Sequence, residues 1–219
     1  MTEDETEKIL RDRQKTIAEI IYRQMKEHFF REETSFQAKE MRPFSRIESN
    51  FGSKLQSDEV YDLNANVPAG EVPQKVFGGF KKACHTLYKF DSNPERILAL
   101  VLENDKVVLK WMRPAPKQFN IYYGPGGCSH YEPDFIVETT SQIFMVETKA
   151  RKELYASDVI EKAVAAQVYC QAASDWNADH GGKSWTYALI SYDEVRINSS
   201  FEFLIKNRTP DEQLGLFRE

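Results

Sequence analysis

The alternation of apolar and polar residues predicts a helix at the start of the chain. Between residues 4 and 33 the apolar side chains fall on one helical stripe with charged residues between them, namely Ile9, Ile17, Ile20, Ile21, Met25 and Phe29. We interpret this segment as a docking helix. Residues 34 to 74 show no clear period and are interrupted by proline and glycine, so short helices and loops are expected there.

A second helix has a well-marked start at Ser92. This serine suits the N-cap, Pro94 suits the first turn, and Glu95 holds the capping-box position three residues after the cap. Apolar residues continue the helical pattern to about Glu103, where the helix is expected to end.

Short apolar runs predict strands in the second half of the chain. The predicted strands cover residues 106–112, 119–123, 134–138, 143–149 and 184–191. An alanine-rich helix over residues 158–173 separates the last two strands, and a short helix is expected after Ser199 or Ser200. The order helix, several strands, helix, strand predicts an α/β (α+β) fold in which helices flank a mixed central sheet.

Three ionisable side chains converge at one end of the predicted hairpin 134–149. Glu147 and Lys149 are two positions apart, and therefore project to the same side of their strand. A turn between Thr140 and Ser141 places Asp134 opposite Glu147. Facing carboxylates repel each other and destabilise the sheet, so a positive charge is required to compensate.

A divalent cation would supply that charge. Mg²⁺, with Mn²⁺ as a possible substitute, prefers carboxylate oxygens such as those of Asp134 and Glu147. A bound ion can activate water for attack on a phosphodiester, and Lys149 could orient that water or stabilise the developing negative charge. These parts suffice for phosphodiester hydrolysis. The alternative is that Glu147 and Lys149 form a salt bridge with no chemical role.

Charge is unevenly distributed along the chain. The net charge is −5, yet residues 75 to 117 hold nine Lys or Arg against four acids. Such a segment can attract phosphates while the whole chain stays acidic, or it can be an ordinary solvated surface. The candidate DNA contacts are Lys110, Arg113, Lys117, Arg151 and Lys162. An ion pair with Asp158 is the alternative for Lys162, because the two residues are four positions apart.

Cysteine usage and hydropathy indicate a cytoplasmic protein. Cys84, Cys128 and Cys170 are far apart and follow no metal-binding spacing, so we interpret them as free thiols. No apolar run reaches the roughly 18 residues of a membrane span. The first residues are charged where a signal peptide would be apolar, so neither a membrane nor export is expected.

From about Val76 to Leu204 an ordered series of motifs resembles the C-terminal endonuclease domain of the restriction subunit of type III restriction enzymes, which belongs to the PD-(D/E)xK nuclease superfamily. The series runs through Phe77–Phe80, Phe90–Arg96, Lys110–Pro116, Gln118–Phe119, Tyr131–Phe135, Val146–Lys149, Lys162, Ala165–Ala166 and Trp185–Tyr187.

The resemblance implies a restriction-endonuclease-like core over residues 76–219, with residues 1–75 as a helical N-terminal extension. It implies that double-stranded DNA is cut with Mg²⁺, using Asp134, Glu147 and Lys149. It also implies that Glu95 reaches toward the metal as a third acid, although a purely capping role for Glu95 is equally open.

The resemblance further implies a helicase/ATPase portion and a methyltransferase recognition subunit as partners. This sequence departs from the full enzyme because a phosphate-binding loop is missing: Gly182-Lys183-Ser184 would need glycine at position 177, where Asn177 stands. Two other functions stay open, a catalytically silent module that docks on DNA or a partner, and a repair or recombination nuclease of the same superfamily.

Overall fold

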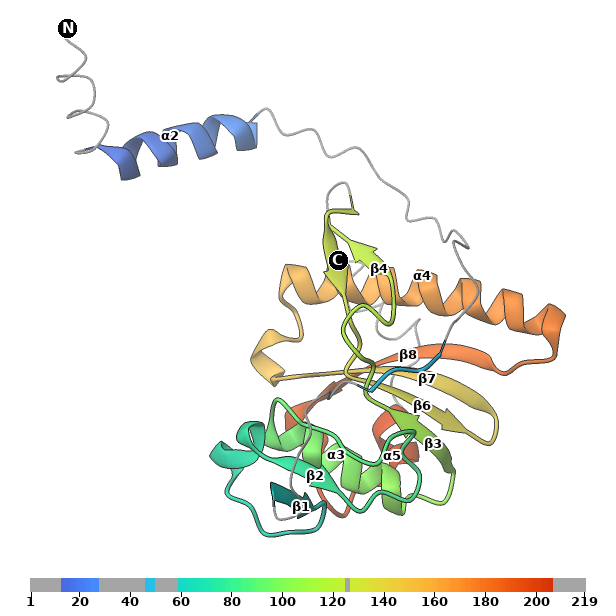
Figure 1. Ribbon diagram of the computed structural model, residues 1–219. Helices are drawn as coiled ribbons and strands as arrows, with labels where there is room; N and C mark the ends of the chain where they lie inside the picture. The colour runs from blue at the N-terminus through green and yellow to red at the C-terminus, as the bar shows by residue number, and fades with distance from the viewer. Residues whose placement is uncertain (1–12, 28–45, 50–58, 125–126, 207–219) are drawn as a thin grey trace, which may run out of the picture. The chain divides into compact units, whose positions relative to one another are not determined.

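The computed structural model describes residues 13–27, 46–49, 59–124 and 127–206 (Figure 1). The chain divides into two compact units, residues 1–35 and 36–219. In the first unit, helix α2 spans Gln14–Glu27. Its Ile20 and Ile21 side chains are exposed. The remaining ends of the predicted helix 4–33 lie outside the described residues.

A four-stranded mixed sheet forms the centre of the second unit. Its strands are β3 (Val108–Met112), β6 (Phe135–Thr139), β7 (Gln142–Lys149) and β8 (Ser184–Ser191), in the order β3-β6-β7-β8. Strand β6 runs antiparallel to both of its neighbours, β3 and β7, whereas β7 and β8 are parallel. The predicted mixed α/β architecture is therefore confirmed, and the strand 184–191 has the predicted bounds.

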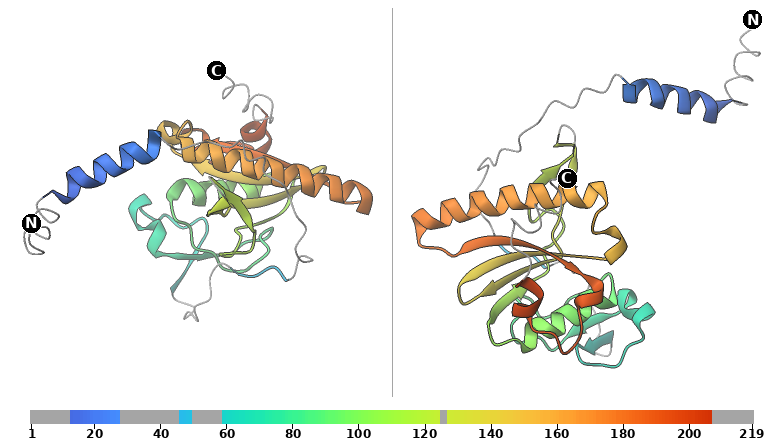
Figure 2. Two further views of the ribbon diagram at one scale, coloured as in Figure 1. Left: turned by 90° about the horizontal axis from the view of Figure 1, so that it is seen from above. Right: turned by 180° about the vertical axis from the view of Figure 1, so that it is seen from behind.

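Helices cover both faces of this sheet (Figures 1 and 2). Helix α3 (Asn93–Asn104) and the short helix α5 (Phe201–Ile205) pack on one face, where Phe144 and Val146 of β7 enter the same apolar core. Helix α4 (Ser157–His180) packs on the other face, against a core that contains Met145 of β7. Because side chains alternate along a strand, Glu147 and Lys149 belong to the side of Met145 and α4.

The long crossover helix α4 runs further than predicted. The sequence pattern places its end near residue 173, but it continues to His180 and stops at Gly181, whose φ of 70° is the left-handed conformation that ends many helices. Its last turns are held by Ser174, whose hydroxyl accepts a hydrogen bond from the backbone N–H of Trp185 in β8 at 2.8 Å. This tertiary contact keeps a polar segment helical.

Two small sheets complete the unit. Strand β1 (Val60–Asp62) pairs in parallel with β2 (Val76–Gly78), and the 3-10 helix η2 (Ala69–Gln74) connects them. The predicted boundary between residues 75 and 76 thus falls between two paired strands. Strand β4 (Ile121–Tyr123) pairs with β5 (Ser129–Tyr131), a strand that the sequence pattern did not predict. Short 3-10 helices η4 (Arg151–Glu153) and η5 (Tyr192–Glu194) follow β7 and β8.

Ser200 caps α5, so the predicted short helix after Ser199 or Ser200 is confirmed. Among the described residues, no helix is both long and apolar enough to cross a membrane.

Candidate active site

The start of α3 forms the predicted cap, with one difference. The Glu95 backbone N–H donates to the Ser92 hydroxyl at 3.4 Å, and that hydroxyl donates to Glu95 Oε1 at 2.9 Å. The Glu95 carboxylate then reaches one residue further back than in a standard capping box, because Oε2 accepts from the Asp91 N–H at 3.0 Å. Both oxygens of Glu95 are therefore engaged in holding the first turn of α3.

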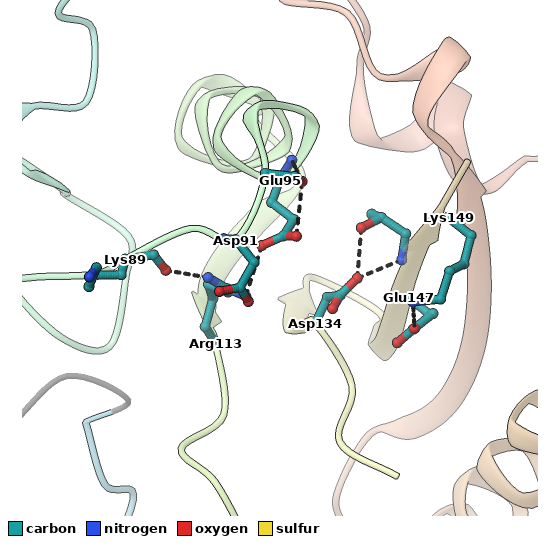
Figure 3. A network of polar contacts seen from close by, with 9 residues as sticks. Lys89, Asp91, Glu95, Arg113, Asp134, Glu147 and Lys149 are labelled. Atoms are coloured by element: carbon teal, nitrogen blue, oxygen red, sulfur yellow. Dashed lines mark hydrogen bonds and ion pairs between the residues drawn. The ribbon is translucent and has the colours of Figure 1, made fainter. Parts of the chain in front are cut away.

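Arg113, the residue after β3, is buried beside this cap (Figure 3). Its guanidinium lies 2.8 Å from Glu95 Oε2 and 2.9 Å from Asp91 Oδ2, and it donates to the Lys89 carbonyl. The rings of Phe90 and Phe135 lie against it. Arg113, a candidate DNA contact from the sequence, thus points into the protein and neutralises the acids at the start of α3.

The hairpin that carries the other candidate residues has the predicted register. Phe135 lies opposite Val146 and Glu138 opposite Ile143, as a turn between Thr140 and Ser141 requires. Asp134 is the residue just before β6. Its Oδ2 accepts hydrogen bonds from the Thr148 backbone N–H at 2.8 Å and from the Thr148 hydroxyl at 2.6 Å. These two bonds orient the Asp134 carboxylate beside the end of β7.

Glu147 and Lys149 form a close pair on the neighbouring strand (Figure 3). Lys149 Nζ lies 2.7 Å from Glu147 Oε1, and the Tyr131 hydroxyl donates to Glu147 Oε2 at 3.1 Å. Burial, reinforced by the negative charge of Asp134, raises the pKa of Glu147 to about 7 despite the ammonium beside it. Burial disfavours the charge on Lys149, but the carboxylates of Glu147 and Asp134 outweigh it and raise the pKa of Lys149.

The three predicted acids are linked through Asp134 without forming one cluster. Burial raises the pKa of Glu95, and the charge of Asp134 adds to that effect, as it does at Glu147. Glu95, however, belongs to the helix on one face of the sheet, whereas Glu147 projects to the other. Within the described ranges, no group of three or more His, Cys, Asp or Glu side chains could hold a metal ion. Asp134 and Glu147 are the two acids that adjoin the Lys149 ammonium.

The other candidate DNA contacts lie at the surface. Lys110, Lys117 and Arg151 are exposed. Lys162 pairs with Asp158 at 3.1 Å, so the ion pair considered as an alternative in the sequence is present. Its Nζ also lies 5.4 Å from the centre of the Tyr123 ring.

Several residues that complete the site were not predicted to have a role. Tyr131 holds Glu147, and Thr148 holds Asp134. Tyr192 follows Ser191, which lies opposite Lys149 in the parallel β7–β8 pair. Burial raises the pKa of Tyr192, and the charges of Glu95 and Asp134 add to that effect. Among these residues, Tyr131 had the clearest signal in the sequence, because it lies two residues before Pro133.

The donor chemistry of this site suits a hard divalent cation. Two carboxylates lie close together, and burial and the charge of Asp134 raise the pKa of Glu147 to about 7. Carboxylate oxygens are preferred ligands of Mg²⁺ and Mn²⁺, and an added cation would relieve the repulsion between the acids. Compared with protein-family models and with curated proteins, the sequence finds no match.

Proposed function

We propose that this chain is a metal-dependent endonuclease that hydrolyses phosphodiester bonds in DNA, with a restriction-endonuclease-like core of the PD-(D/E)xK class. The observation that carries the proposal is that the Asp134 carboxylate lies near the buried Glu147 carboxylate. Lys149 Nζ lies 2.7 Å from the same Glu147 carboxylate. A site that served stability alone would gain little from a buried carboxylate whose pKa is raised to about 7.

Asp134 and Glu147 are the residues that would hold Mg²⁺ or Mn²⁺. Such an ion, when bound, supplies an activated water and offsets the negative charge that develops on the phosphate. Lys149 provides a fixed positive charge beside the same carboxylates, where it would bind a phosphate oxygen and stabilise the transition state. Glu95 takes a supporting role, because its oxygens are already held by Arg113, Ser92 and Asp91.

The proposed substrate is double-stranded DNA, and the proposed setting is a type III restriction enzyme. Exposed Lys110, Lys117 and Arg151 are available to phosphates, whereas Arg113 is not. The net charge of −5 gives weak general attraction for DNA. A helicase/ATPase portion and a methyltransferase subunit would hold the nuclease at its substrate and raise its effective concentration. We place the complex in the cytoplasm.

Plasmid nicking tests the proposed activity. The purified chain, at high micromolar concentration and low salt, is incubated with supercoiled plasmid and Mg²⁺, Mn²⁺ or EDTA. Such concentrations are needed because non-specific DNA binding has dissociation constants of about 10⁻⁴ to 10⁻⁶ M. Nicking with either metal and none with EDTA supports the nuclease. DNA binding without nicking under all conditions would refute it and favour the catalytically silent docking module.

Metal affinity is expected to depend on pH around the pKa of Glu147. A metal ligand must lose its proton before it coordinates, and the pKa of Glu147 is about 7. We therefore expect Mn²⁺ binding, measured by calorimetry, to weaken about tenfold between pH 8 and pH 6. An Asp134→Asn variant serves as the comparison, because loss of the Asp134 charge lowers the pKa of Glu147 and shifts the dependence to lower pH. An affinity that is constant over this range would contradict the assignment of Glu147 as a ligand.

A further inference from the structure

Thr148 occupies one oxygen of the Asp134 carboxylate completely. Its backbone N–H and its hydroxyl both donate to Asp134 Oδ2, at 2.8 Å and 2.6 Å (Figure 3). A carboxylate oxygen has about two lone-pair sites, so both sites of Oδ2 are taken. Among the described residues, the other oxygen, Oδ1, accepts no hydrogen bond. Asp134 therefore has one oxygen, Oδ1, with which to bind a cation.

Packing does not explain the hydroxyl of Thr148. The residue is fully buried, and it follows Glu147 in β7, so the two side chains project to opposite faces of the sheet. Ile190, which lies opposite Thr148 on β8, is an apolar core residue. Valine has nearly the same size as threonine and would suit this surrounding. In the part of the chain that the structure describes, the hydroxyl bonds only to Asp134, so its role is at that carboxylate.

The second proposed ligand, Glu147, has one partner on each oxygen. Lys149 Nζ lies 2.7 Å from Oε1, and the Tyr131 hydroxyl donates to Oε2 at 3.1 Å. One lone-pair site on each of these oxygens therefore stays open. The two acids together offer a cation only Asp134 Oδ1 and the two oxygens of Glu147. The rest of a coordination shell would have to come from water or from a substrate phosphate, as is usual for Mg²⁺.

We propose that Thr148 determines which cation the site binds: by filling both sites of Asp134 Oδ2 it limits Asp134 to one coordinating oxygen, and the site then favours Mg²⁺ and Mn²⁺ over Ca²⁺. The inference rests on the proposed function, because it takes Asp134 and Glu147 as the metal ligands. Ca²⁺ gathers about six to eight oxygens, often by binding both oxygens of one carboxylate, and this carboxylate cannot bind it in that way. Mg²⁺ needs only a single bond from each acid. Thr148 acts through Asp134 and is thus a positioning residue.

Calorimetric titration of the full chain with Mn²⁺ and with Ca²⁺, without DNA and at a single pH, tests this selectivity. Thr148→Val removes the hydroxyl and opens one site on Asp134 Oδ2. We expect the ratio of the Ca²⁺ to the Mn²⁺ dissociation constant to fall about tenfold in this variant, the size of effect that hydrogen bonds to metal ligands have on affinity. Thr148→Ser keeps the hydroxyl and should keep the wild-type ratio. Thr148→Ala also lacks the hydroxyl and should show the same fall if valine prevents folding.

Thr139→Val is the matched control. Thr139 is also a buried threonine of this hairpin, but its hydroxyl donates to the Gln142 carbonyl at the turn, at the opposite end of β6 from Asp134. Its ratio should equal that of the wild type. An unchanged ratio in Thr148→Val, an equal fall in Thr148→Ser or Thr139→Val, or the absence of Mn²⁺ binding by the wild type would overturn the proposal. A failure of plasmid nicking is distinguishable, because a chain that shows the expected selectivity but does not nick DNA refutes only the nuclease.

Discussion

Glu147→Gln is expected to reduce the rate of metal-dependent DNA cleavage by at least about 10² to 10³-fold, the loss that follows removal of one group that stabilises charge in a transition state. Glutamine keeps the size of the side chain and can still accept the hydrogen bond from Tyr131. It removes the negative charge that would bind the metal and that pairs with Lys149. Plasmid nicking in Mg²⁺ measures the rate.

The same substitution should stabilise the metal-free protein at high pH. The pKa of Glu147 is raised from 4.5 to about 7, so between these values the folded protein holds a proton that the unfolded chain has lost. Stability therefore falls as pH rises through this range, by a few kcal/mol at most. Glu147→Gln removes this penalty, and should melt at a higher temperature than the wild type above pH 7 and at a similar temperature near pH 5.

Glu138→Gln provides a control on the same hairpin. Glu138 also pairs with a lysine, Lys183, at 2.6 Å, but it lies at the opposite end of β6 from Asp134. Its replacement should leave cleavage unchanged. Asp134→Asn should lose cleavage like Glu147→Gln, since asparagine retains an oxygen for the two bonds from Thr148. Cleavage at the wild-type rate by either site variant would remove that residue from the active site.

Arg113→Met is expected to lower the free energy of unfolding by about 3–5 kcal/mol, the usual cost of breaking a buried ion pair from one side. Methionine fills part of the space between Phe90 and Phe135. It cannot donate to Glu95, Asp91 or the Lys89 carbonyl, so the Glu95 carboxylate is left buried without a counter-ion. Urea unfolding followed by circular dichroism measures the change.

Two further variants separate the ion pair from simple loss of packing. Adding Glu95→Gln to Arg113→Met should recover part of the stability, because no unpaired buried charge remains. Lys110→Met, at an exposed position of the preceding strand β3, should change stability by less than about 0.5 kcal/mol. If Arg113→Met instead unfolds like the wild type and binds DNA less tightly, Arg113 contacts DNA, as the sequence first suggested.

Local patterns were sufficient for the elements that support the site. The Ser92 cap depends on residues three positions apart, and the 134–149 hairpin depends on one short turn and the strand alternation that follows from it. Both agree with the structure because each is decided by neighbours in the sequence. The approach of Asp134, Glu147 and Lys149 followed from the same alternation.

These local patterns could not predict contacts between segments that are distant in the sequence. An arginine within a basic stretch looks the same whether it is exposed or buried, and the partners of Arg113 lie some twenty residues earlier in the sequence. Strand β5 is only three residues long and contains serine and histidine, so its alternation is too short to recognise. The sequence left open whether Glu95 reaches the metal or only caps its helix, because a sequence does not show that α3 covers the face of the sheet away from Glu147.

The two strands that pair with β7 are connected to it by chain segments of very different length. Strand β6 is connected through a tight turn, whereas β8 is reached only after the 24 residues of α4. Antiparallel hairpins close quickly, and parallel pairs across a helix form late. Asp134, Glu147 and Lys149 should therefore come together early in folding, while their side chains are still hydrated. The repulsion between the carboxylates of Asp134 and Glu147 becomes costly only later, when the remaining elements bury Glu147. We expect Mg²⁺ to slow unfolding more than it accelerates refolding, a difference that stopped-flow measurements with and without the ion would reveal.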